Sequence, residues 1–221
     1  DLLSAGLEGK EPEDALRWAL GEYHPEIKLA CSFSVEDVTI VDILMKIEPR
    51  ARVFAIDTGR LDEETYEVAQ AVRERYGLSI EFCFPQRQPL ERLEREKGLY
   101  SFQESLEKRH ECCQIRKVEP LERGLKGLRA WITGLRGEQS VTGTELRILE
   151  VDRGHGGIYK INALSAWTSQ QVWDYVEEHD RPYNRLYDQG YSSIGCAPCT
   201  RAILPGEHPR AVQPPHQARY R

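Results

Sequence analysis

At 221 residues, 40% hydrophobic and 30% charged, the chain fits one α/β domain with a real core, and its composition excludes a disordered or membrane-embedded protein. No apolar run approaches the roughly 20 residues that span a bilayer, the start lacks a signal-peptide layout, and the net charge of −6 argues against a nucleic-acid surface. Six cysteines without an export signal indicate metal or redox sites in a reducing compartment, so we expect a cytoplasmic protein.

Strands and helices alternate in the first half of the chain. The hydrophobic patterns predict helices over residues 1–24, 38–48 and 66–77, and strands over residues 27–33, 52–56 and 79–84. This order predicts a mostly parallel sheet flanked by helices, with ligands bound beyond the carboxyl ends of the strands.

The second half is less regular. It predicts a charged helical section over 89–127, strands over 130–133 and 158–162, a surface turn over 150–157, and a helix that a capping box at Thr168 and Gln171 opens. We expect one α/β domain over residues 1–205 and a C-terminal tail over residues 206–221.

Two strand ends carry polar residues suited to a nucleotide. The segment Cys31–Asp37 follows a strand and opens a helix, so its backbone N–H groups and the hydroxyls of Ser32 and Ser34 could hold phosphate. It lacks the lysine of a Walker A loop, and a strand–helix turn with an N-cap serine is the alternative. Asp57–Arg60 ends the next strand, where an ordinary turn is again the alternative. We expect both segments to face one crevice.

Four of the cysteines form two tight pairs. Cys112 and Cys113 are adjacent, and Cys196 and Cys199 form a C-x-x-C turn. Four thiols in two pairs are typical of a metal centre, either a structural zinc or an iron–sulfur cluster, and adjacent cysteines are an awkward zinc pair. The remaining two, Cys31 and Cys83, are most simply small buried hydrophobic residues.

Several segments together resemble a known family. They are Ser32–Val38, Ile56–Arg60, Cys112–Leu121, Trp131–Arg136, Pro182–Asn184 and Asp188–Arg201. Over about residues 25–210 the chain resembles the assimilatory adenylyl-sulfate (APS) reductases of the PAPS reductase family. The resemblance implies an adenine nucleotide α-hydrolase-like (Rossmann-like) α/β fold. It also implies a [4Fe-4S] cluster held by Cys112, Cys113, Cys196 and Cys199.

The implied reaction is reduction of APS to sulfite and AMP by thioredoxin or a similar dithiol, in sulfate assimilation and cysteine biosynthesis. Whether the protein forms a homo-oligomer stays open. By the same resemblance, Lys117 would lie between cluster and substrate, Arg136 and Arg210 would meet the anion, and strand-end segments would hold the adenosine. The implied substrate-binding residues are Ser32, Ser34, Ile56, Thr58, Gly59, Arg60, Lys117, Gly134, Leu135, Arg136 and Arg210.

The end of the sequence departs from the family pattern. In the family, an arginine, a tryptophan run and a Glu-Cys-Gly-Leu-His segment with the nucleophilic cysteine follow the position of Arg210, whereas here Gln213 replaces that arginine and the residues end at Arg221. No catalytic nucleophile is therefore assigned among these residues. An APS reductase with an absent or altered tail, a non-catalytic iron–sulfur adenylate-binding protein and a PAPS-specific reductase remain alternatives. An ATP-pyrophosphatase-type enzyme is weakened by the lack of a Ser-Gly-Gly-x-Asp-Ser loop.

Overall fold

The computed structural model describes residues 6–139, 146–204 and 206–207. Internal contacts divide the chain into two compact units. Unit 1 comprises Asp1–Ala55, Glu67–Glu81 and Leu125–Asn184, and unit 2 comprises Ile56–Tyr66, Phe82–Gly124 and Arg185–Arg221. The predicted tail over 206–221 lies almost wholly outside the described residues.

A six-stranded sheet has the order β3-β2-β1-β4-β6-β5. Its strands are β1 (Ile27–Ala30), β2 (Arg52–Ile56), β3 (Ile80–Cys83), β4 (Ala130–Ile132), β5 (Leu149–Asp152) and β6 (Ile158–Ile161). β1 runs parallel to β2 and β4, and β4 runs parallel to β6, as the alternating pattern predicts. The carboxyl ends of these strands consequently share one edge of the sheet.

Strand β5 corrects the prediction of a turn over 150–157. It pairs antiparallel with β6 at the edge of the sheet, and only the residues after Asp152 turn. Leu149 is buried and Val151 is 51% exposed, so the strand alternates between core and solvent. Two apolar positions separated by one charged residue are too few for the periodicity to reveal the strand.

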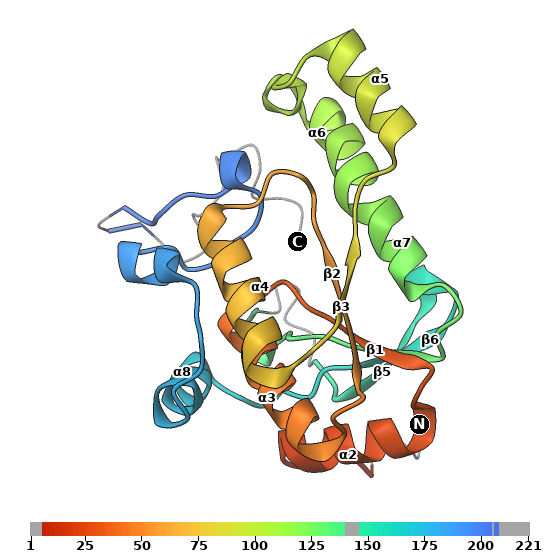
Figure 1. Cartoon of the computed structure of the whole chain (residues 1–221), viewed down its shortest axis with the longest axis vertical. Coiled ribbons are helices and arrows are strands. Elements are labelled where there is room, and N and C mark those ends of the chain that lie inside the picture. Colours follow the sequence, from red (N-terminus) through yellow and green to blue (C-terminus); the bar gives the residue numbers. More distant parts are fainter. Residues whose placement is uncertain (1–5, 140–145, 205, 208–221) are drawn as a thin grey trace. The chain divides into compact units, whose positions relative to one another are not determined.

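Helices of unit 1 pack against one another around α3 (Val35–Ile47), which contacts α2 (Pro12–Tyr23) and α8 (Ser169–Glu178) (Figure 1). The first ten residues of α3 are all buried, which explains why its apolar residues do not form a simple stripe. The predicted capping box of Thr168 and Gln171 is present at the start of α8. Helix α4 (Glu63–Tyr76) begins in unit 2 and continues into unit 1.

Unit 2 is mainly helical. It contains α5 (Arg87–Lys97), η1 (Ser101–Gln103), α6 (Leu106–Cys113), η2 (Gln114–Val118), most of α7 (Glu119–Leu125), η5 (Arg185–Gln189) and η6 (Ala197–Cys199). α6, η2 and α7 follow one another without a break as one helical rod, drawn in green in Figure 1. None of the helices that the structure describes is both long and apolar enough to cross a membrane.

Candidate functional site

One face of the rod formed by α6 and η2 carries the adjacent thiols. Arg109, Cys112, Cys113, Arg116 and Lys117 have the spacing i, i+3, i+4, i+7 and i+8, which places side chains on one side of a helix. All five line the same pocket in unit 2. A helical cysteine doublet can therefore aim both thiols at one place, together with three cations.

The rod widens immediately after the cysteine doublet. Over η2 it makes a π-helical turn, in which the backbone N–H of Glu119 donates to the carbonyl of Gln114, five residues back. Pro120 has no N–H and cannot donate to the carbonyl of Arg116, so an α-helix could not have continued unchanged. Single π-helical turns of this kind are frequent at functional sites, because they change the direction of the side chains they carry.

The C-x-x-C segment forms a tight turn that presents the other two thiols. The backbone N–H of Cys199 donates to the carbonyl of Cys196 at 2.8 Å. The hydroxyl of Thr200 donates to the same carbonyl at 2.6 Å. Pro198 lies in the short helical turn between the two cysteines, where its fixed φ angle suits the conformation.

This turn is attached to the strand-end segment Asp57–Arg60. The backbone N–H of Ala197 donates to the carbonyl of Arg60 at 2.8 Å, and Cys196 forms a bridge with Leu61. The hydroxyl of Thr58 lies 3.2 Å from the sulfur of Cys196. The segment predicted to bind a nucleotide thus also positions one of the thiols.

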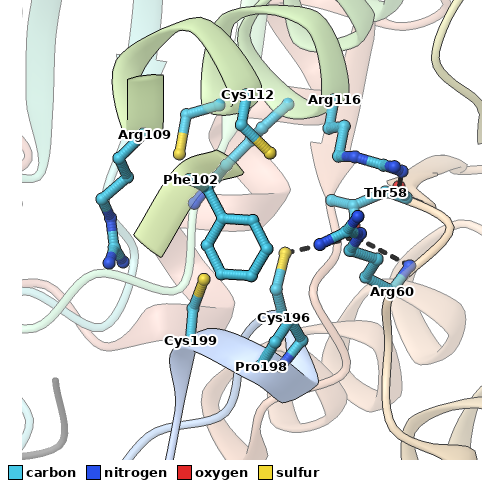
Figure 2. A pocket seen from close by; sticks show the side chains of 11 residues that line it. Thr58, Arg60, Phe102, Arg109, Cys112, Arg116, Cys196, Pro198 and Cys199 are labelled. Atoms are coloured by element: carbon cyan, nitrogen blue, oxygen red, sulfur yellow. Dashed lines mark hydrogen bonds between the residues drawn. The ribbon is translucent and has the colours of Figure 1, made fainter. Parts of the chain in front are cut away.

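The four thiols line a single pocket in unit 2 (Figure 2). The figure shows Cys112 above and Cys196 and Cys199 below, with the ring of Phe102 beside them. About 370 Å³ of space at the pocket is free of protein atoms, a volume that includes open solvent at its mouth. Among the described residues, no group of three or more His, Cys, Asp or Glu side chains has the arrangement that would hold a single metal ion.

Apolar packing surrounds two of the thiols. Cys112 belongs to a buried cluster with Leu93 and Phe102, against which Ile115 and Cys199 pack. Burial raises the pKa of Cys112, and it raises the pKa of Cys199 to about 11. The charge of Arg116 opposes this shift at Cys112, and the charge of Arg109 opposes it at Cys199. Because burial outweighs these charges, a metal centre would have to displace protons from both thiols.

Two of the arginines in the pocket share a carboxylate. Arg60 and Arg116 both form ion pairs with Glu94, at 3.1 Å for Arg60. Arg116 also donates to the carbonyl of Thr58 at 2.7 Å, and the guanidinium of Arg60 lies 4.9 Å from the centre of the Phe102 ring. These contacts connect α5, the rod and the strand-end segment around the thiols.

Two polar atoms of the pocket remain unsatisfied. Among the described residues, Nη1 of Arg109 and Nε of Arg116 are buried without a hydrogen-bond partner. Four thiols in one pocket, with buried cationic N–H donors beside them, fit a thiolate-ligated iron–sulfur cluster, whose sulfur atoms accept such hydrogen bonds. Cys112, Cys113, Cys196 and Cys199 would hold it.

In unit 1 the loop after β1 is fastened to the first turn of α3. Ser34 is the N-cap residue, and its hydroxyl accepts a hydrogen bond from the backbone N–H of Asp37 at 3.3 Å. Ser32 donates its backbone N–H and its hydroxyl to the Asp37 carboxylate. Burial, offset in part by these hydrogen bonds, raises the pKa of Asp37 to about 6. Phe33 between the serines is buried and has a φ of 62°, a strained conformation for a bulky residue.

The loop after β4 lies against the same turn of α3. Arg136 is buried and donates Nε to Glu36 at 2.9 Å, and it also pairs with Glu138. A Cβ atom on Gly134 would overlap Oδ1 of Asp37. The parallel pairing of β1 with β4 brings the two loops together.

The predicted substrate residues lie in both units. Ser32, Ser34, Gly134, Leu135 and Arg136 are in unit 1, where Leu135 is 40% exposed and Arg136 is occupied by its two carboxylate partners. The members in unit 2 are Ile56, Thr58, Gly59, Arg60 and Lys117, of which Thr58, Arg60 and Lys117 line the cysteine pocket. Arg210 lies outside the described residues.

Four residues around the cysteines are absent from the sequence-based site. Arg109 and Arg116 could have been found, because they share the helical spacing of the cysteine doublet. Nothing in the local pattern indicates Phe102 or Glu94, which reach the thiols and arginines only through the packing of η1 and α5.

Known proteins resemble the chain over most of its length. The chain is 44% identical over 213 residues to an adenosine 5′-phosphosulfate reductase of Pseudomonas aeruginosa (strain LESB58), covering 94% of this chain and 79% of the relative. It is 47% identical over 198 residues to the adenosine 5′-phosphosulfate reductase of Burkholderia cepacia, covering 90% and 79%. A crystal structure of phosphoadenylyl-sulfate (PAPS) reductase from Candida auris is 29% identical and superposes with a TM-score of 0.78, covering 91% of this chain and 95% of that one.

The fold and the family agree. The structural likeness supports the predicted Rossmann-like α/β fold with a mostly parallel sheet. The family profile described as "Phosphoadenosine phosphosulfate reductase domain" matches residues 26–202, which include both strand-end loops of unit 1 and all four paired cysteines. The chain therefore belongs to the phosphoadenosine phosphosulfate reductase family.

Proposed function

We propose that this protein is a cytoplasmic oxidoreductase of sulfate assimilation, which reduces APS to sulfite and AMP with thioredoxin or a similar dithiol as the reductant. The observation that carries the proposal is the gathering of Cys112, Cys113, Cys196 and Cys199 in one pocket with basic side chains. The chain's identity to relatives named adenosine 5′-phosphosulfate reductases supports APS as the substrate.

We assign a [4Fe-4S] cluster to the four thiols of the pocket. In such a cluster each thiolate binds a different iron atom, so the four thiols can be spread around the cluster. A structural zinc needs four ligands at tetrahedral positions around a single ion. When bound, it would supply an anionic centre next to the substrate. The pocket suits an anionic cluster, because positive side chains next to it would balance the charge of the thiolates and sulfides. These side chains are Arg60, Arg116 and Lys117.

The proposed chemistry is a displacement at sulfur. A thiolate attacks the sulfate sulfur of APS, the bond from that sulfur to the bridging phosphate oxygen breaks, and AMP leaves with the electron pair. One thiolate of the dithiol then attacks the enzyme sulfur, which releases sulfite and forms a mixed disulfide. The second thiol of the dithiol displaces the enzyme thiolate, so the dithiol becomes a disulfide. We assign the attacking thiolate to none of the six cysteines. Four line the pocket, Cys83 lies in β3, and Cys31 is buried with a pKa that burial raises well above its ordinary value.

The substrate contacts are assigned by residue type. Lys117 is exposed and, among the described residues, has no carboxylate partner, so its charge is available for the phosphosulfate. Ser34, Gly134 and Leu135 follow strand ends, where backbone groups can contact an adenosine. Arg136 pairs with Glu36 and Glu138, so it would contact the anionic substrate only after breaking one of these ion pairs.

Sulfite release measured on the full-length natural protein tests the proposal. The protein is incubated with APS or PAPS, thioredoxin, thioredoxin reductase and NADPH, and iron and acid-labile sulfide are measured in the same preparation. We expect sulfite from APS and about four irons per chain. Iron and bound AMP without sulfite release would instead indicate a non-catalytic adenylate-binding protein. Faster release from PAPS would contradict the substrate, and one zinc without sulfide would contradict the cofactor.

A further inference from the structure

Arg109 is a buried cation for which the described residues provide no counter-charge. Its side chain lies on α6, only 7% of the residue is exposed, and Nη1 is buried without a hydrogen-bond partner among the described residues. No carboxylate in the part of the chain that the structure describes forms an ion pair with it. The two other arginines of the pocket, Arg60 and Arg116, both pair with Glu94.

An uncompensated buried charge is costly. Removing one partner from a buried ion pair is strongly destabilising, because the other charge is left without compensation in a medium of low polarity. A guanidinium has five N–H donors and cannot lose its proton to avoid this cost. Arg109 therefore requires an anion that the side chains of the described residues around it do not supply.

The position of Arg109 indicates where that anion lies. Arg109 lines the cysteine pocket, and Figure 2 shows its side chain reaching from the rod past Phe102 to the level of Cys199. We infer that Arg109 is a positioning residue for the cluster: it balances the charge of the thiolate-bound iron and donates an N–H to sulfur on the Cys199 side. This inference rests on the proposed [4Fe-4S] cofactor.

The alternative counter-charge is the substrate. A phosphosulfate group is also anionic, and an arginine facing it would change substrate affinity without affecting the iron site. The cluster and the substrate can be distinguished as counter-charges in the absence of substrate. Only if the counter-charge is the cluster should substituting Arg109 change the properties of the iron site before substrate is added. Hydrogen bonds from the surroundings to cluster ligands alter the iron–sulfur bonds and typically contribute 10–100-fold to metal affinity.

The test compares Arg109→Met and Arg109→Lys with the wild-type holoprotein. Arg92→Met is the matched control, because Arg92 is an exposed arginine on α5 of the same unit. The readouts are iron and sulfide content, the Fe–S(Cys) stretching bands in resonance Raman spectra, and the rate of iron loss to a chelator. Circular dichroism verifies folding. If Arg109→Met yields no folded holoprotein, Arg109→Lys, which keeps the charge, carries the comparison.

We expect Arg109→Met to shift the stretching bands and to lose iron about tenfold faster than the wild type. Arg109→Lys should retain iron almost as well as the wild type, because lysine keeps the positive charge. Its Fe–S(Cys) stretching bands should stay shifted, since lysine lacks the planar donor fork of arginine. Arg92→Met should match the wild type. Unchanged bands and iron loss in both Arg109 variants would overturn the inference, and a lower APS affinity in them would then identify the substrate as the counter-charge. Absence of iron from the wild-type protein would contradict the proposed cofactor, and it would therefore overturn this inference as well.

Discussion

The carboxylate of Asp37 accepts two hydrogen bonds from Ser32, one from the backbone N–H at 2.5 Å and one from the hydroxyl at 2.7 Å. Ser34 completes the arrangement by accepting from the backbone N–H of Asp37. The loop after β1 is thus held in one conformation around the strained Phe33. The Ser32 hydroxyl, which the sequence analysis assigned to a phosphate, donates its hydrogen bond to Asp37 in this structure.

The raised pKa of Asp37 predicts a pH-dependent contribution to stability. Its pKa is about 6 in the folded protein, whereas an unfolded chain has about 3.9. Between these values the folded state binds more protons, so this group's contribution to the free energy of unfolding falls as pH rises, by at most about 1.4 kcal/mol per pH unit.

Urea unfolding of wild type and Asp37→Asn between pH 4 and 7 measures this contribution, because the other groups cancel in the difference. We expect the stability of the wild type relative to the variant to decrease with pH and to level off above the pKa of about 6. A difference that stayed constant or increased with pH would show that Asp37 titrates at its ordinary value.

Substituting Gly134 tests how closely the loops after β1 and β4 pack. A Cβ atom there would overlap Oδ1 of Asp37 and lie 3.1 Å from the Cβ of Glu36, and the carboxylate cannot move without breaking its bonds to Ser32. We expect Gly134→Ala to lower the free energy of unfolding by about 1–3 kcal/mol. Gly21→Ala in α2, where a Cβ atom meets nothing within 4 Å, should raise it by roughly 0.5–1 kcal/mol. Equal effects of the two substitutions would refute the close contact.

Cys196→Ser tests whether the C-x-x-C turn holds the cluster. The substitution should abolish the brown absorption and most of the bound iron, because a serine oxygen is a poor replacement for a thiolate ligand. Cys83→Ser is the control, since Cys83 lies in β3 and does not line the pocket. Visible spectra and iron analysis measure both variants. Iron loss of similar extent in both would indicate that the substitutions act through folding.

Lys117→Ala tests which part of the substrate meets the exposed lysine of the pocket. A charge-assisted hydrogen bond contributes about 1.5–3 kcal/mol, so we expect APS binding to weaken at least tenfold and AMP binding to change much less. Lys126→Ala removes an exposed lysine that does not line the pocket, and it should leave both affinities unchanged. Isothermal titration with APS and AMP measures them. Equal losses for the two ligands would contradict a contact with the sulfate end.

Asp42→Ala should cause a large loss of stability in unit 1. Asp42 is 1% exposed and receives hydrogen bonds from Tyr76, Tyr175 and Arg181. Burial opposes ionisation, but these and a contact from Lys46 lower the pKa of the carboxyl group. Breaking such a buried network typically costs about 3–5 kcal/mol.

The exposed pair of Glu13 and Arg17 on α2 provides the comparison for Asp42. Glu13→Ala removes an ion pair whose side chains are 63% and 59% exposed, and such pairs contribute about 0.3–0.5 kcal/mol. Urea unfolding followed by circular dichroism measures both substitutions. Losses of similar size would mean that the Asp42 network contributes no more than a surface pair.

Much of the fold could be predicted because its signals are local. The limits of β2 agree with prediction, since an apolar run between a helix-ending proline and a polar turn has one simple interpretation. The capping box at Thr168 was visible for the same reason. Strand β5 was missed because an edge strand of four residues has too little periodicity to distinguish it from a turn.

The sequence by itself determined that four cysteines occur as two pairs, that polar segments follow the strands, and that these motifs belong to one family. Only the tertiary structure decided what surrounds them. It brought Cys112 and Cys199 into one pocket and paired Arg60 and Arg136 with carboxylates. It also left Arg109 buried with no counter-charge among the described residues. The physical reason is that helix spacing and turn chemistry act over a few residues. The partners of a buried charge come from segments far apart in the chain, and packing alone selects them.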